Sequence, residues 1–194
     1  MPRQHHDVVL SLGSNLGDRL AWLAQACAAL KACPGIRLLA CSPVYETEPD
    51  GVPQAFAQHS FLNQVALVGT TLAPEAFSAA VHAIEERLGR TRGAGPGSPR
   101  TLDIDIIAFG PLRSDAPELT LPHPRARLRR FVLQPLADLL PDFVFPGDTQ
   151  SVSDLLRALP PAPAVRRFGS DAHLLPAAPA SARTEAPRST RSTR

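Results

Sequence analysis

The sequence lacks several features that would assign it to a special class of protein. It has no run of roughly eighteen apolar residues, as a membrane-spanning helix would need, and its start, MPRQHHDVVLSLGSN, lacks the long apolar stretch of a signal peptide. Its three cysteines, Cys27, Cys33 and Cys41, are odd in number and lack metal-ligand spacing, so we expect reduced thiols. These absences favour a cytoplasmic protein that does not bind a membrane.

An excess of charge is also absent from most of the chain. The formal net charge is +2, and residues 168–194 account for all of it because their four arginines outnumber their two acidic residues. The neutral remainder argues against nucleic-acid binding. Beyond Pro160 the composition shifts to Pro, Ala, Ser and Arg, with little to bury. We therefore predict a folded domain over residues 1–160 and a disordered tail over residues 161–194.

Apolar periodicity and turn residues predict the order β-α-β-β-α-β, followed by helical additions. This order is typical of a ferredoxin-like α+β fold with an antiparallel sheet and additional C-terminal helices. Asp18 and either Ser151 or Ser153 are the expected helix N-caps. Long loops are predicted over 46–60 and 89–99, and loops of that length are usually functional. The predicted strands are 7–12, 36–45, 61–70 and 101–109, and the predicted helices are 20–32, 75–88, 131–139 and 153–159.

The predicted strand TLDIDIIAF, residues 101–109, carries two aspartates among apolar residues. Asp103 and Asp105 are two positions apart, so a strand places both carboxylates on one face, where they repel each other. A cation such as Mg²⁺ would relieve this repulsion, and it commonly takes one or two carboxylates and fills its shell with water and phosphate oxygens. An edge strand with two solvated aspartates is the alternative.

Arginines precede and follow this strand in two clusters. They would suit a polyphosphate, because a metal would bridge its oxygens and the arginines would neutralise its remaining charge. Two solvated basic surfaces are the alternative explanation. No Walker A motif and no kinase glycine-rich set is present, so a nucleotide-using enzyme would be of another type. His123, held between two prolines, could donate to a phosphate or cap a turn. The clusters are Arg87, Arg90, Arg92 and Arg100, then Arg125, Arg127, Arg129 and Arg130.

Asn63 is the polar residue at the start of the apolar strand FLNQVALVGT. Its amide can both donate and accept hydrogen bonds, which suits the edge of a heterocycle. Phe61 lies on the same strand face, and Phe131 is a candidate to close over a flat ring from the other side. Both phenylalanines would also fit a hydrophobic core. Tyr45 and Thr47 could shape the same pocket.

Six segments together resemble a known family. They are SLGSNLGDR, SPVYETEP, FLNQVAL, IEERLGR, PRTLDIDII and LTLPHPRARLRRFVLQPL, in that order over about residues 7–150. The sequence is similar to the 6-hydroxymethyl-7,8-dihydropterin pyrophosphokinases of folate biosynthesis. The resemblance implies that the β and γ phosphates of ATP pass together to the hydroxymethyl oxygen of the pterin, and that AMP leaves.

The resemblance also implies roles for individual residues. Asp103 and Asp105 would hold two Mg²⁺ ions, and Arg90 and Arg100 would assist the transfer. The implied ATP-binding residues are Glu85, Arg92, His123 and Arg129. The implied pterin-binding residues are Thr47, Asn63 and the stacking pair Phe61 and Phe131. Residues 46–60 and 89–99 match the mobile loops of the family, whose closure would assemble the site and exclude water.

Several positions depart from the family pattern: His82, Pro96, Gly97, Ser98 and Pro124. We expect them to alter loop behaviour and affinity rather than the type of reaction. The residues leave open whether one aspartate accepts the hydroxyl proton or only orients the hydroxyl through the metal.

We expect the pyrophosphokinase to be a monomer. Two other functions are alternatives to it. One is a non-catalytic module that holds a nucleotide or a pterin, but such a binder has no need of two facing carboxylates. The other is RNA binding through the arginine-rich turn and tail, against which the neutral body argues.

Overall fold

The computed structural model describes residues 5–48, 60–89 and 100–169. They form an antiparallel sheet with a small separate hairpin. In the sheet, five strands lie side by side in the order β5 (Asp103–Phe109), β1 (His6–Ser14), β4 (Phe61–Thr70), β3 (Tyr45–Thr47) and β8 (Val165–Arg167). β2 (Ile36–Cys41) pairs with β4 as well, and β6 (Ser114–Ala116) pairs with β7 (Leu119–Leu121) in the hairpin.

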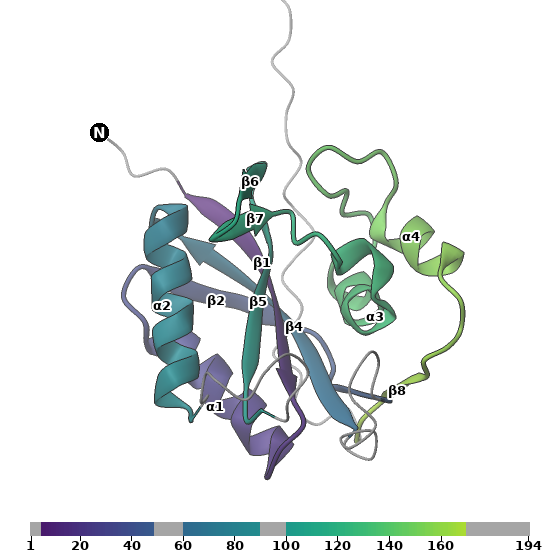
Figure 1. Cartoon of the computed structure of the whole chain (residues 1–194), viewed down its shortest axis with the longest axis horizontal. Helices are drawn as coiled ribbons and strands as arrows, with labels where there is room; N and C mark the ends of the chain where they lie inside the picture. The colour runs from purple at the N-terminus through teal and green to yellow at the C-terminus, as the bar shows by residue number, and fades with distance from the viewer. Residues whose placement is uncertain (1–4, 49–59, 90–99, 170–194) are drawn as a thin grey trace, which may run out of the picture.

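Helices lie on both faces of this sheet (Figure 1). α1 (Arg19–Ala32) and α2 (Pro74–Arg87) pack on one face, over a core that includes Leu10, Leu12 and Ile104. α3 (Arg130–Leu139) and α4 (Val152–Ala158) pack on the other, over a second core that includes Val65 and Ile107. The predicted ferredoxin-like α+β fold with additional C-terminal helices is confirmed.

Two of the predicted helix caps are present. The Asp18 carboxylate accepts a hydrogen bond of 3.0 Å from the Ala21 backbone N–H at the start of α1. Ser151, and not Ser153, caps α4. Its hydroxyl accepts from the Asp154 backbone N–H at 3.1 Å, while the Asp154 carboxylate accepts from the Ser151 N–H at 3.2 Å. This reciprocal pair is a capping box, which explains where α4 begins.

The sheet differs from the prediction in two places. The strand predicted over 36–45 is interrupted after Cys41 and resumes as β3 at Tyr45, because Pro43 cannot donate to the ladder. The sheet also includes residues beyond position 160, because β8 pairs with β3 and places Thr47 opposite Val165. Three residues in a proline-rich segment carry no readable strand pattern, so the sequence did not indicate β8.

The two predicted long loops lie only partly within the described residues. Residues 49–59 and 90–99 lie outside them, as do residues 170–194. One Arg19 guanidinium nitrogen donates to the Glu46 carboxylate at 2.9 Å and to the Ser60 backbone carbonyl at 2.8 Å, so α1 ties together the two sides of segment 49–59. Among the described residues, no helix is long and apolar enough to cross a bilayer.

Candidate active site

The two aspartates of β5 lie on the sheet face that bears α3. Ile104 between them packs into the core under α1 and α2, so the alternation of the strand directs Asp103 and Asp105 to the opposite face. Register places Asp103 opposite Gly13 of β1 and Asp105 opposite Ser11. The Asp105 side chain stays 37% exposed, so the pair is accessible to a ligand.

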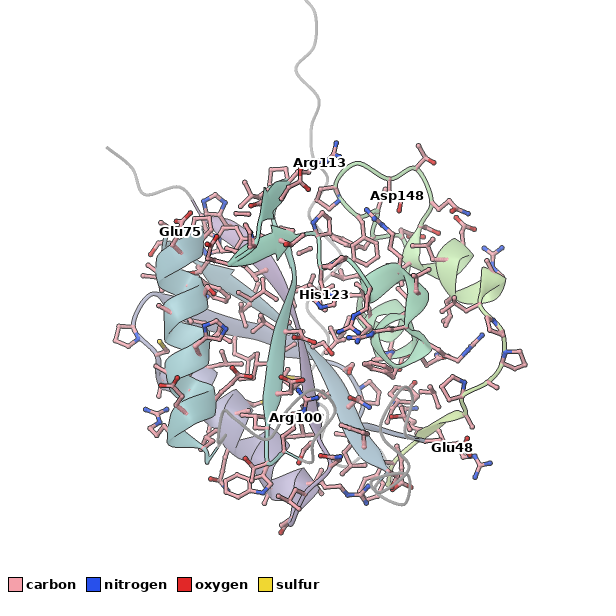
Figure 2. All side chains as sticks on the ribbon, viewed as in Figure 1. Glu48, Glu75, Arg100, Arg113, His123 and Asp148 are labelled. Atoms are coloured by element: carbon pink, nitrogen blue, oxygen red, sulfur yellow. The ribbon has the colours of Figure 1, made fainter. Side chains whose placement is uncertain are left out.

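Cationic and polar groups surround this carboxylate pair. An Arg100 guanidinium nitrogen lies 2.8 Å from an Asp103 oxygen, and an Arg129 nitrogen lies 3.9 Å from an Asp105 oxygen. Figure 2 shows Arg100 near the start of β5 and His123 farther along the strand, on the side of α3. Burial and the negative charge of Asp103 raise the pKa of Asp105, while the charges of His123, Arg129 and Arg100 partly oppose this shift. The pair is therefore electrostatically strained, and an added cation would stabilise its charged form.

His123 is fixed beside Asp105 by hydrogen bonds of its own turn. Its backbone N–H donates to the Ile107 carbonyl of β5 at 2.9 Å, and its Nδ1 accepts from the Arg125 backbone N–H at 3.2 Å. Burial, with the charges of Arg129 and Arg125, lowers the pKa of His123 against the opposing effect of Asp105. The neutral ring therefore carries its proton on Nε2. His123 therefore caps its turn by accepting at Nδ1, and Nε2 keeps the donor that a phosphate would need.

The arginines after His123 do not act as one cluster. Arg129 faces Asp105, as described above. Arg127 pairs with Asp148 at 2.7 Å and lies over the Phe145 ring, 5.4 Å from its centroid. Arg130 donates to backbone carbonyls that follow α4, at 2.9 Å to Pro160 and 2.8 Å to Leu159. Arg127 and Arg130 therefore stabilise the fold, whereas Arg129 directs its charge to Asp105.

The predicted heterocycle site lies two strands away from the aspartates. Asn63 and Thr47 are buried, and the Asn63 amide donates to the Thr47 hydroxyl at 2.7 Å. In the sheet, Asp103, Gly13 and Asn63 occupy one row across β5, β1 and β4. Since neighbouring strands are about 4.8 Å apart, the two side chains are separated by about 10 Å at backbone level. Gly13 has no side chain to obstruct the space between them.

Phe61 and Phe131 are both half-buried, as expected of rings that retain an open face. Phe61 pairs with Thr47 across β4 and β3. Phe131 lies in the first turn of α3, and the Arg129 guanidinium lies over its ring at 5.3 Å from the centroid. Phe61 therefore lies on the same strand as Asn63, and Phe131 lies on α3 beside Arg129.

Two groups were not found by sequence reasoning. The Asn15 side-chain carbonyl accepts from the Arg100 backbone N–H at 2.8 Å, and the Asn15 N–H donates to the Arg100 carbonyl at 3.2 Å. This pairing holds Arg100, which precedes β5, against the turn after β1. Gly13, near the end of β1, is the second, and the Gly/Ser/Asn-rich segment SLGSN that contains both residues was the available signal.

Glu85 occupies a different position from the other predicted residues. It is fully buried on α2, and one of its carboxylate oxygens accepts from the Ile104 backbone N–H at 2.8 Å. Ile104 lies between the two aspartates, so Glu85 braces β5 from the opposite face. Arg90 and Arg92 lie outside the described residues.

The donor set around the aspartates fits a hard divalent cation. Within the described residues, no three His, Cys, Asp or Glu side chains are grouped as a metal site. The two carboxylates fit Mg²⁺, which commonly uses few protein ligands and completes its shell with water and phosphate oxygens. The neighbouring Arg100, Arg129 and His123 are donors suited to such phosphates.

An α+β sheet that carries two accessible carboxylates ringed by arginine and histidine defines a class of phosphate-transferring enzyme. The family model described as 7,8-dihydro-6-hydroxymethylpterin-pyrophosphokinase matches residues 9–141. The chain belongs to this family.

Curated relatives agree with this assignment. A 2-amino-4-hydroxy-6-hydroxymethyldihydropteridine pyrophosphokinase of Pseudomonas aeruginosa is 42% identical over 153 residues, which cover 79% of this chain and 91% of the relative. One of Methylorubrum extorquens is 42% identical over 152 residues, covering 78% and 92%.

Solved structures support the fold. A crystal structure described as HPPK-DHPS in complex with substrates is similar with a TM-score of 0.63 at 12% identity, over 79% of this chain and 43% of that one. A Plasmodium falciparum HPPK-DHPS structure gives a TM-score of 0.62 at 13% identity, over 80% and 43%. The chain thus spans less than half the length of these solved chains.

Proposed function

We propose that this protein transfers the pyrophosphoryl group of ATP to the hydroxymethyl oxygen of 6-hydroxymethyl-7,8-dihydropterin and releases AMP, as a step of folate biosynthesis. The observation that supports it most strongly is the row Asp103, Gly13, Asn63. A flat bicyclic heterocycle that bonds Asn63 at one edge can extend its hydroxymethyl group over Gly13 toward the aspartates. The separation of about 10 Å suits that span.

The chain's own residues would bind and orient the two substrates. Thr47 and Asn63 would bond the pterin edge, with Phe61 and Phe131 against its ring faces. Arg129 and His123 are the proposed residues of the ATP side, together with Arg92, and Glu85 would support the aspartate strand from the opposite face. Arg100 and Arg90 would stabilise the charge that develops during transfer. Holding both reactants in line would supply much of the rate, because phosphoryl transfer depends mainly on positioning and charge stabilisation.

Asp103 and Asp105 would hold Mg²⁺, two ions in our proposal. When bound, the metal neutralises phosphate charge and draws electron density from the transferred group. The proposed enzyme is a cytoplasmic monomer that binds no nucleic acid.

The test measures AMP formation from ATP by the purified protein. We expect AMP only when both Mg²⁺ and hydroxymethyldihydropterin are present, because the reacting oxygen belongs to the pterin. Formation of ADP instead, or no turnover by correctly folded protein, would refute the proposal.

Variants of the acidic pair test the residue assignment. Asp103→Asn and Asp105→Asn should each lower kcat by at least about a hundredfold, because each loses a charged metal ligand. Asp142→Asn is the matched control, since Asp142 is an exposed aspartate beyond α3. Full activity of either strand variant with an unchanged circular dichroism spectrum would refute the metal assignment.

A further inference from the structure

Two of the three cysteines form a close pair that the proposed reaction does not use. Cys27 of α1 and Cys41 at the end of β2 have their sulfur atoms 3.7 Å apart, which is direct contact. The Cys27 sulfur also lies 3.6 Å from the Gln64 side-chain oxygen of β4, an acceptor that holds it toward the sheet. Both thiols belong to the core under α1 and α2, so the sheet separates them from Asp103 and Asp105.

The two thiols differ in access and in acidity. Cys27 is partly exposed, whereas Cys41 is buried. The hydrogen bond with Cys41 lowers the pKa of Cys27, while that bond and burial raise the pKa of Cys41. Since the thiolate is the nucleophile, an approaching disulfide would meet an accessible and more reactive sulfur at Cys27 with a second sulfur directly behind it.

We infer that Cys27 and Cys41 are a thiol pair that closes to an intramolecular disulfide by exchange with a low-molecular-weight disulfide such as oxidised glutathione. The Cys27 thiolate attacks one sulfur of glutathione disulfide and releases glutathione thiolate, which takes up a proton. The Cys41 thiol then gives up its proton and attacks the Cys27 sulfur of the mixed disulfide, releasing the second glutathione. Two protein thiols are oxidised and one small disulfide is reduced, so atoms and electrons balance.

Closure requires little rearrangement. The sulfur atoms must approach from 3.7 Å to the bonding distance of about 2.05 Å, a movement that small side-chain rotations and slight backbone shifts can supply. Cys33 provides a contrast within the same protein. Its sulfur is partly exposed near the end of α1, and its recorded contact is with the Pro34 carbonyl at 3.9 Å. Cys33 should therefore form a mixed disulfide and no internal bond.

The experiment exposes the full-length native protein to oxidised glutathione and reads the product by intact mass and by peptide mapping without reduction. We expect the peptides of Cys27 and Cys41 to be joined, with the loss of two hydrogen atoms for this bond in addition to the glutathione that Cys33 takes up, and we expect dithiothreitol to reverse both changes. Cys33→Ser is the matched control and should form the same bond at a rate within about twofold of the parent.

The Cys41→Ser variant tests the order of attack. It should accumulate the glutathione adduct on Cys27, because the resolving thiol is missing. The inference is overturned if the native protein joins Cys33 to either partner, or if it gives only adducts without an internal bond. It is equally overturned if Cys27 and Cys41 remain reduced while Cys33 reacts. The outcome does not depend on the proposed transferase activity, so failure of one leaves the other standing.

Discussion

At the scale of single residues, Gly13 is the position where the absence of a side chain matters most. A Cβ atom there would lie 3.0 Å from the Asn63 side-chain oxygen, tight enough that the amide would have to shift by a few tenths of an ångström. The same atom would occupy the row between Asn63 and Asp103, where we propose that the heterocycle lies.

Gly13→Ala should therefore raise the KM for the pterin by about tenfold, equivalent to about 1.4 kcal/mol of binding. The KM for ATP and the thermal stability should change little. Steady-state kinetics with each substrate varied in turn measure both constants. In an Asn63→Ala background the same substitution should cost much less, because the displaced amide is gone. Equal losses in the two backgrounds would show that Gly13 does not act through Asn63.

Arg129 and Arg130 are adjacent in sequence but have separate tasks. Arg129→Ala should lower kcat/KM by about a hundredfold with little change in stability, because it removes a charge that faces Asp105. Arg130→Ala should instead lower the free energy of unfolding by about 1–2 kcal/mol and keep kcat, because it leaves carbonyls near Leu159 and Pro160 without their donor. Urea denaturation and turnover, measured on both variants, separate these effects. The reverse pattern would contradict the assignment.

The candidate site could be proposed from the sequence where a residue type and its spacing already indicate the chemistry. The aspartates at period two, the amide in an apolar strand and the histidine between prolines were all identified in this way. The separate tasks of the arginines could not be predicted, because they depend on contacts with Asp148 and with the end of α4, which are distant in sequence. The contact of Asn15 could not be predicted either, because its partner Arg100 is 85 residues away in the sequence.

At the scale of elements, a hydrogen bond joins α3 to β3, a strand of the proposed heterocycle site. The Tyr45 hydroxyl donates to the Asp138 carboxylate at 2.6 Å. Tyr45 also faces Asn63 across β3 and β4. The contact thus fixes α3, which carries Phe131, relative to the proposed heterocycle site. Burial and the Asp138 carboxylate raise the pKa of Tyr45 to about 12.

This shift predicts how stability depends on pH. Tyr45 ionises near 10 when unfolded and near 12 when folded, so the folded state binds more protons between these values. The stabilisation is complete below about pH 10 and is lost as pH rises toward about 12. Tyr45 is the only tyrosine of the chain, so phenolate absorbance reports it directly. Folded protein should titrate about two units above protein in denaturant.

Tyr45→Phe is the matched variant for this measurement. It should lose about 1–2 kcal/mol of stability at neutral pH and show a weaker decline of stability above pH 10. An ordinary phenol titration in the folded protein would show that the hydrogen bond to Asp138 does not hold in solution.

Predictions of helices and strands succeeded where the apolar pattern was long. They failed where a local irregularity set the bounds or the register of the element. α1, α2 and β4 were predicted within one residue, because each has caps, turns or an extended apolar run at its ends. Along β5 the register shifts opposite Val9 and Leu10, so Ile107 and Ala108 both enter the core under α3. A bulge of this kind leaves only an unbroken apolar run in the sequence.

At the scale of the whole molecule, β8 completes the sheet beside the proposed heterocycle site. β8 pairs with all three residues of β3, and the Phe168 backbone N–H donates to the Val44 carbonyl at 2.8 Å. Thr47 therefore lies between Phe61 on one side and Val165 on the other. Without β8, β3 would be an exposed three-residue edge.

Truncations on either side of β8 test its contribution. A protein that ends at residue 160 should show a pterin KM raised by about tenfold or more and a lower melting temperature, because Thr47 loses its outer neighbour. A protein that ends at residue 169 is the matched control and should retain the parent's kinetics and stability. If both truncations behave alike, β8 has no role in the site.

The pairing of β8 with β3 also has a consequence for the order of events during translation. A ribosome releases the acidic strand, the arginine turn and α3 well before Val165 leaves the exit tunnel. The nascent chain can thus assemble the proposed phosphate side of the candidate site first, whereas the proposed pterin edge must wait for β8. A message cut short near codon 160 would yield a protein that has the acidic and basic residues of the candidate site but lacks β8 beside the proposed pterin site.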